Sequence, residues 1–166
     1  MSTRFGSVAF LLLLVVLGAF VWRTSQALPA VVASHFAANG TANGYMPRGI
    51  YTVLVMALVV GAPLLLALVP AATAGKGARR LNIPDREYWL VPERRAATLA
   101  YIRVQGRWFS AAVALFLTYV HWLVVRANAL RPPMLSTTGI VAGLVVFFVA
   151  LAVWLTLLFR RFRRRA

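Results

Sequence analysis

The sequence predicts an all-α integral membrane protein, a single four-helix domain over residues 1–166. Of its 166 residues, 61% are hydrophobic, and four runs, 5–22, 49–75, 108–125 and 132–159, contain no charged residue. At about 1.5 Å of rise per residue, even the shortest run reaches about 27 Å, close to the hydrocarbon thickness of a bilayer. A formal charge of +15 would suggest nucleic acid in a soluble protein, but this chain is too apolar for one, so we expect no nucleic-acid partner.

The distribution of basic residues predicts the orientation. All but four of the 18 Lys and Arg residues lie in the N-terminal segment, the loop 73–107 or the C-terminal tail. The four exceptions are Arg23, Arg48, Arg126 and Arg131. The positive-inside rule therefore places both termini and the loop 73–107 in the cytoplasm of a bacterial cell, with the chain in the inner membrane.

The first apolar run has an alternative interpretation as a secretory signal. Arg4 precedes it, and Ser25-Gln26-Ala27 has the small-x-small pattern of a cleavage site. The run is longer than the ~7–15 residues of a signal core, so we favour a first membrane span over about 5–22.

Residues 23–49 form the predicted extracytoplasmic loop between the first two helices. Asn39-Gly40 and Asn43-Gly44 favour tight turns because both residue types accept a positive φ. We therefore expect a short, structured, twice-turned lid centred on His35. Its candidate ligand-contacting residues are His35, Phe36, Gly40, Asn43, Gly44, Tyr45 and Arg48.

The remaining spans are expected at about 50–72, 108–128 and 138–159. Gly61-Ala62-Pro63 predicts a kink in the second span, because Pro63 removes a backbone hydrogen bond. Pro92 suits the first position of a helix, and no breaker follows until Pro132, so one long helix is expected from about Pro92 to Ala129. Its last two thirds would cross the membrane.

The third span carries small and polar residues on one side. Thr118, His121 and Asn128 recur with Ala111, Ala114 and Val125 at spacings of three or four. This face should meet other helices and not lipid. An intramembrane histidine is a candidate functional residue, although one interhelical hydrogen bond is the more common role.

Chemistry-bearing motifs are few. His35 and His121 could approach each other, but no acid or cysteine accompanies them, so we expect no metal and no cofactor. Motifs of metalloproteases, phosphate loops and nucleophile elbows are missing from the sequence, and we do not expect an enzyme.

Two further groups suggest contacts. Tyr88, Trp89, Arg94 and Arg95 in the cytoplasmic loop could bind an acidic partner or membrane lipids, although positive-inside anchoring and burial in the headgroup zone also explain them. Gly139 and Gly143 form a G-x-x-x-G motif that permits close helix packing, either within the bundle or in a homo-oligomer.

The outer loop resembles the motif of a bacterial membrane family, domain of unknown function 1648. The residues that carry the resemblance are Leu28-Pro29, His35-Phe36, Gly40, Gly44-Tyr45 and Arg48. In that family a Leu-Pro pair is followed by His-aromatic, a glycine, Asp-Gly-aromatic and a basic residue before the next span; here Asn43 replaces the Asp. Residues 82–95 also resemble the cytoplasmic loop of a subgroup. Members include the immunity protein against the sporulation-delay toxin, so the resemblance implies immunity or signalling.

The resulting hypothesis is a non-catalytic membrane protein that senses or blocks a peptide at the outer face. The alternative is a structural or accessory subunit of a larger membrane complex, with a protein partner or a second copy of the chain.

Overall fold

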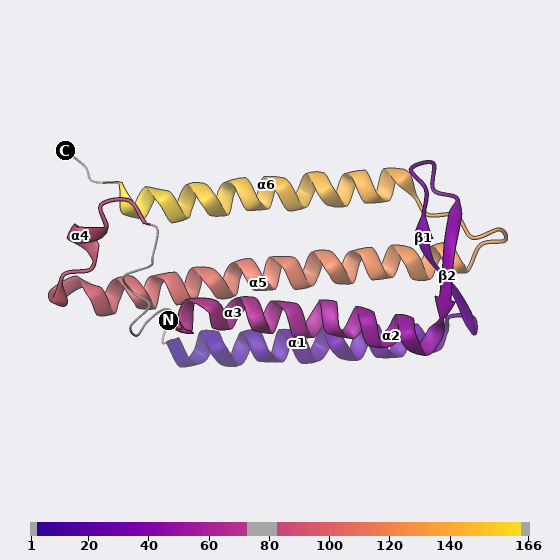
Figure 1. Cartoon of the computed structure of the whole chain (residues 1–166), viewed down its shortest axis with the longest axis horizontal. Helices are drawn as coiled ribbons and strands as arrows, with labels where there is room; N and C mark the ends of the chain where they lie inside the picture. Colours follow the sequence, from indigo (N-terminus) through magenta and orange to yellow (C-terminus); the bar gives the residue numbers. More distant parts are fainter. Residues whose placement is uncertain (1–2, 73–82, 164–166) are drawn as a thin grey trace.

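Four long helical segments run side by side in the computed structural model, which describes residues 3–72 and 83–163 (Figure 1). They are α1 (Thr3–Gln26), the segment from α2 (Arg48–Met56) to α3 (Ala62–Ala72), α5 (Pro92–Asn128) and α6 (Thr137–Phe162). Each is long and apolar enough to cross a membrane. The prediction of a helical, multi-pass membrane protein is confirmed at this level.

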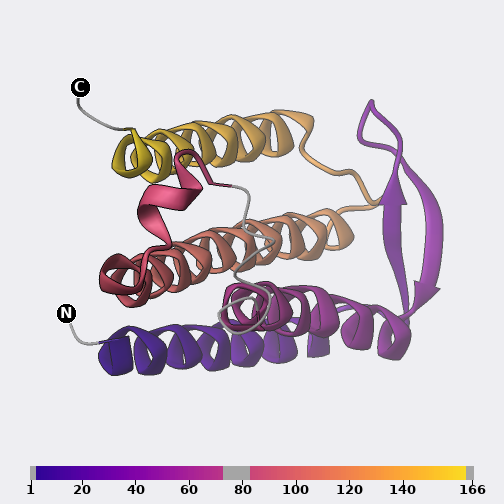
Figure 2. The same cartoon turned by 60° about the vertical axis from the view of Figure 1, so that its left-hand side comes forward.

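Helix α5 is the centre of the bundle. It is continuous for 37 residues and begins at Pro92, in the first-turn position where a missing N–H costs nothing. The helices α1 and α3 pack along one side of α5, and α6 packs along the opposite side (Figures 1 and 2). The long helix expected from about Pro92 to Ala129 is therefore confirmed, and it includes residues 92–107 of the segment predicted as the cytoplasmic loop. Residues 73–82 lie outside the described part of the chain.

The second span contains the irregularity that the sequence predicts. A π-helical turn, η1 (Ala57–Gly61), joins α2 to α3, in which Pro63 is the second residue. Pro63 has no N–H for the carbonyl four residues earlier, and its ring crowds that carbonyl. A wider turn relieves both problems without ending the helix.

The loop between α1 and α2 is a β-hairpin, so the all-α prediction is wrong there. Strand β1 (Val31–Phe36) pairs antiparallel with β2 (Ala42–Pro47). Of the two predicted Asn-Gly turns only the first exists, with Gly40 at φ +87°. Gly44 lies within β2 opposite His35, next to an irregularity in the register. The lid is therefore turned once and not twice.

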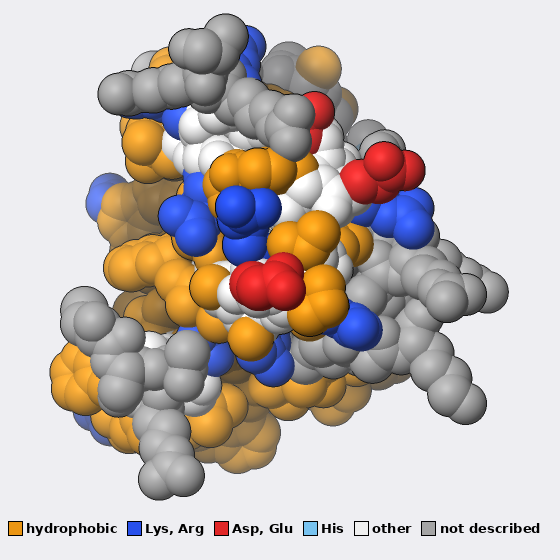
Figure 3. Space-filling model, turned by 90° about the vertical axis from the view of Figure 1, so that its left-hand side faces the viewer, with side chains coloured by type: hydrophobic (Ala, Val, Ile, Leu, Met, Phe, Trp, Pro, Cys, Tyr) orange, Lys and Arg blue, Asp and Glu red, His pale blue; other side chains and the backbone are white. Residues whose placement is uncertain are grey.

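The two ends of the bundle differ in character. The hairpin covers one end, which we call the hairpin end; the start of α1, the end of α6 and the short helix α4 (Arg86–Trp89) lie at the other, the arginine end (Figure 1). Basic, apolar and a few acidic side chains are interspersed at the arginine end (Figure 3). The described arginines of this end are Arg86, Arg94, Arg95, Arg103, Arg107, Arg160, Arg161 and Arg163.

The hydrophobic core lies between α1, α2, η1 and α5 and extends under the hairpin. Val21 of α1, Val32 of β1 and Val59 of η1 are almost completely buried in it. Helix α6 adds no buried residue to this cluster. The hairpin is thus part of the core, whereas α6 packs chiefly on α5.

Candidate functional site

Asn128, at the end of α5, docks the hairpin onto the bundle. Its Oδ1 accepts a hydrogen bond from the Ala33 N–H at 2.9 Å, and its Nδ2 donates to the Ala33 carbonyl at 2.9 Å. The same Nδ2 donates to the carbonyl of Val124 in its own helix at 2.9 Å. The amide thereby acts as a neighbouring strand for one residue of β1. Asn128 is 4% exposed, so water cannot easily replace it.

This contact determines which backbone N–H and C=O groups of the hairpin point away from the ladder. Ala33 directs its N–H and C=O at Asn128, away from β2, and its partner in the register is Tyr45. Two directly opposed residues of an antiparallel pair either both bond to each other through N–H and C=O or both direct these groups outward. The Tyr45 N–H and C=O therefore also point away from the ladder. The bond from the Arg48 N–H to the Ala30 carbonyl, at 2.9 Å, agrees with this alternation. Strand β2 therefore has an open edge at Tyr45.

Two more tethers hold the hairpin. The guanidinium of Arg48 donates from Nη1 to the carbonyls of Gln26 and Leu28, at 3.2 and 3.0 Å, where α1 ends. A cation at a helix C-terminus satisfies carbonyls that have no partner in the helix and complements its dipole. At the tip, the Leu135 N–H donates to the Gly40 carbonyl at 2.8 Å. A Cβ at Gly40 would overlap the Leu135 carbonyl oxygen, so only glycine permits this approach.

His121 joins three helices beneath the hairpin. Its Nε2 is 2.8 Å from the Thr24 hydroxyl of α1, and its Nδ1 is 2.9 Å from the Tyr51 hydroxyl of α2. Thr24 also bonds the Phe20 carbonyl at 2.7 Å, which uses its only proton. The imidazole must then donate from Nε2 to Thr24 and accept at Nδ1 from Tyr51. One neutral tautomer satisfies every partner, so this arrangement is structural.

The other polar residues of that face are also buried. The Thr118 hydroxyl donates its only proton to the Ala114 carbonyl of its own helix at 2.8 Å. In the neighbouring helix α1, Ser25 is fully buried, and its Oγ has no hydrogen-bond partner within residues 3–72 and 83–163. The face therefore packs helices together and does not line an open site.

The outward face of the hairpin carries exposed side chains. Tyr45 is 56% exposed, and Val31 and Pro47 beside it are exposed as well. His35 bonds the Oδ1 of Asn43 through Nδ1 at 2.6 Å, across the strands. A Cβ at Gly44 would lie 2.8 Å from the His35 Cβ, so glycine makes room for the histidine. We call Val31, His35, Asn43, Tyr45 and Pro47 the hairpin face.

Phe36 differs from the rest of the predicted lid, because it packs against the core. The two histidines also have different surroundings: His35 is exposed on the hairpin face, whereas His121 is 2% exposed between helices. Within the described residues, no group of three or more His, Asp or Glu side chains could hold a metal ion.

The aromatic residues at the arginine end contact the chain itself. The Trp89 ring meets Phe162 edge to face at 5.6 Å between centroids, and its Nε1 donates to the Phe162 carbonyl at 3.4 Å. The guanidinium of Arg94 lies 3.9 Å above the Tyr88 ring. Trp89 therefore ties α4 to the end of α6, and Tyr88 ties it to the start of α5, where Arg94 is exposed. Arg95 is also exposed, one position further along α5.

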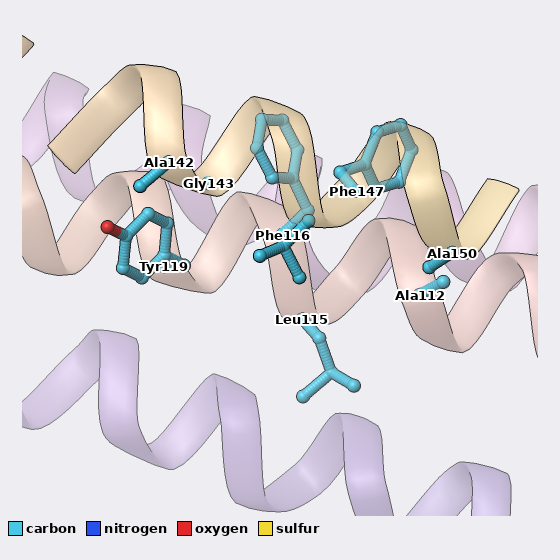
Figure 4. A pocket seen from close by; sticks show the side chains of 9 residues that line it. Ala112, Leu115, Phe116, Tyr119, Ala142, Gly143, Phe147 and Ala150 are labelled. Atoms are coloured by element: carbon cyan, nitrogen blue, oxygen red, sulfur yellow. The ribbon is translucent and has the colours of Figure 1, made fainter. Parts of the chain in front are cut away.

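The two glycines of α6 are used inside the chain. The Tyr119 hydroxyl of α5 donates to the Gly139 carbonyl at 2.9 Å. A Cβ at Gly143 would overlap the Tyr119 ring, which lies directly against this glycine (Figure 4). The G-x-x-x-G motif therefore packs α6 on α5 in the described structure.

Sequence reasoning missed the partners of the buried polar residues. Thr24 and Tyr51 lie near the hairpin-end termini of their helices, where polar residues need no special explanation. Their separations from His121, 97 and 70 positions, leave no local pattern. The available signal was that both lie at the same depth as His121, close to the predicted outer interface.

Comparison with known proteins agrees with the resemblance at the outer loop. Residues 9–61 match the family model described as Domain of unknown function (DUF1648). The match covers most of α1, the whole hairpin, α2 and η1. A search of curated proteins and a search of solved structures found no match. Over residues 9–61, about a third of its length, the chain is thus similar to domain of unknown function DUF1648, the family that the outer-loop motif predicts.

Proposed function

We propose that this protein is a non-catalytic component of the bacterial inner membrane that recognises an extended peptide or peptide toxin at the outer face. The observation that carries the proposal is the open edge of β2 at Tyr45, beside an exposed aromatic ring. An extended peptide can add to an open strand edge through backbone hydrogen bonds, while side-chain contacts supply selectivity. Tyr45 offers one N–H and one C=O for such a strand.

The hairpin face supports this mode of recognition. The Tyr45 ring offers apolar area and a polar hydroxyl at little cost in side-chain entropy. His35 and Asn43 hold each other across the strands next to it. Pro47 shortens the open edge. An N–H at this position would point outward like that of Tyr45, and proline has none. A short edge favours a specific ligand over aggregation with other strands.

The tethers of the hairpin support a relay of occupancy. Asn128 links the hairpin to α5, a continuous helix about 55 Å long that ends among the arginines. Arg48 links it to α1. A ligand that shifts the hairpin would therefore act directly on helices that reach the other side of the membrane, where a cytoplasmic partner could respond.

A growth experiment tests the function. Cells that lack the protein are exposed to the peptide fraction of their own spent medium, with and without complementation. The proposal predicts that wild type protects or responds, and that Tyr45→Ala loses most of this effect. Val53→Ala, at an exposed apolar position of α2, is the matched control and should behave as wild type. Equal activity of both variants would contradict recognition at the hairpin face.

The orientation of the chain in the membrane is tested by labelling cysteines that are introduced one at a time. The sequence contains no native cysteine that would also react. Ala38→Cys reports on the hairpin tip and Ala97→Cys on the arginine end; both side chains are exposed. A membrane-impermeant maleimide should label Ala38→Cys in spheroplasts and Ala97→Cys only after the membrane is opened. The reverse pattern would place the hairpin in the cytoplasm and end the proposal.

A second candidate function is that of an accessory subunit in a larger membrane complex. It is supported by the outward face of α6, where Val145, Val146 and Val149 are 57%, 69% and 59% exposed. Gly139 and Gly143 do not support this second function, because both contact Tyr119 within the chain. Purification in mild detergent followed by intact mass spectrometry should then reveal a stoichiometric protein partner, and a lone chain would contradict it.

A further inference from the structure

One apolar groove follows the seam between α5 and α6. It consists of two hollows, of about 390 and 430 Å³, that share Ala112, Phe147 and Ala150. The groove extends along α5 from Tyr119 to Gln105, about 21 Å at the rise of an α-helix. Figure 4 shows the hollow nearer the hairpin, with small side chains where the two helices face each other.

Aromatic contacts between the two helices form part of the groove lining. Phe116 stacks on Phe147 at 4.7 Å between centroids, and Phe109 stacks on Trp154 at 5.1 Å. The Trp154 Nε1 donates to the Gln105 carbonyl at 3.2 Å, which removes its only donor from the groove. The lining thus presents mainly hydrocarbon. A groove between two helices in contact is narrow enough for a flexible hydrocarbon chain. A third helix, about 10–12 Å across, is too wide to enter it and would contact only its edges.

Arginine side chains lie at one end of the groove. Leu157 is its last lining residue on α6, and Arg160 and Arg161 follow three and four positions later on the same side of the helix. The guanidinium of Arg161 lies 4.7 Å from the centroid of the Tyr101 ring and 5.7 Å from that of Trp89. Stacking on a ring positions a guanidinium and leaves its N–H edge available for an anion.

We propose that this groove binds one anionic phospholipid, with an acyl chain along the α5–α6 seam and the phosphate at Arg160 and Arg161. Three features favour a lipid over a peptide or helix. The groove is apolar over a length comparable to one leaflet, it opens where the bilayer surrounds the chain, and its basic end lies at the headgroup level of the adjoining leaflet. Basic pockets between membrane helices select anionic headgroups.

Native mass spectrometry of the full chain in mild detergent tests the proposal, with phosphatidylglycerol and phosphatidylcholine as probes. We expect one phosphatidylglycerol to remain bound at detergent levels that strip phosphatidylcholine. Changing Arg160→Gln and Arg161→Gln together should weaken phosphatidylglycerol binding about 25-fold, at roughly fivefold per arginine. Arg160→Lys with Arg161→Lys should keep most of the affinity. Equal retention of both lipids, or no effect of the glutamine pair, would overturn the headgroup assignment.

A second pair of variants tests the groove itself. Ala150→Phe fills the seam, whereas Val149→Phe adds the same ring one position away, outside the groove. The first should lose the bound phosphatidylglycerol and the second should retain it, with unchanged helical circular dichroism in both. Retention in both variants would show that the acyl chain lies elsewhere. A stable dimer of the wild type without bound lipid would assign the groove to a second copy of the chain and overturn the proposal.

Discussion

Replacing Asn128 by leucine tests how the hairpin is held. Leucine has the same branched arrangement of side-chain heavy atoms but leaves the N–H and C=O of Ala33 without partners, and Ala33 is 1% exposed. A buried backbone group without a partner costs about 1–3 kcal/mol, so two such groups cost at least about 2 kcal/mol if the hairpin stays docked. The hairpin can escape this cost by opening to water. The population of the open hairpin should therefore rise roughly thirtyfold.

The assay is the reaction rate of a single cysteine in place of Val32, a residue of β1 whose side chain is completely buried in the core. Native cysteines do not interfere, because the sequence has none. A thiol that reacts only in the open state reports the open fraction directly when closing is faster than labelling. In liposomes, Val32→Cys should label about thirty times faster with Asn128→Leu than without it.

Asn43→Ala provides the control. Its side chain bonds the exposed His35 and not the bundle, so the labelling rate of Val32→Cys should change by less than about twofold. If Asn128→Leu also leaves the rate unchanged, the docking role of Asn128 is refuted, together with the deduced open edge at Tyr45.

Two further predictions concern the packing of the helices. Gly143→Ala forces a Cβ into the Tyr119 ring and should destabilise the protein by about 1–3 kcal/mol, whereas Gly49→Ala, with open space around it, should be neutral in detergent melting experiments. Equal melting temperatures would exclude the tight α5–α6 contact. His121→Leu leaves the buried Tyr51 hydroxyl unpaired, so Tyr51→Phe should cost less in that background than in wild type. Additive losses in this double-mutant cycle would show that the hydrogen bond contributes nothing to stability.

The membrane-spanning helices could be predicted because the bilayer imposes a simple rule. In hydrocarbon, every backbone group needs an internal partner, so a charge-free run of sufficient length becomes a helix. The start of α5 followed from the position of Pro92, and the irregularity in the second span followed from Pro63. Both depend on one residue and its immediate neighbours, which is the information that a local pattern contains.

The hairpin could not be predicted in the same way. Val31-Val32-Ala33 is too short an apolar run to distinguish strand from loop, and Asn43-Gly44 has the composition of a turn although it lies in β2. The register is held by Asn128, 95 positions from Ala33. Likewise, the function of Gly143 depends on Tyr119 in another helix. Contacts of this kind depend on the packing of the whole chain, and no local sequence motif indicates them.

The most direct test of peptide recognition at the hairpin face is photo-crosslinking from Tyr45 in living cells. Benzoylphenylalanine takes the place of Tyr45, and the same probe at Val53 serves as the lipid-facing control. After irradiation, mass spectrometry identifies what is bound. Recognition at the hairpin face predicts a defined secreted peptide that is attached at position 45, absent at position 53, and displaced when the same peptide is added in excess. Adducts of lipid alone at both positions, in cells that respond normally to their own medium, would contradict it.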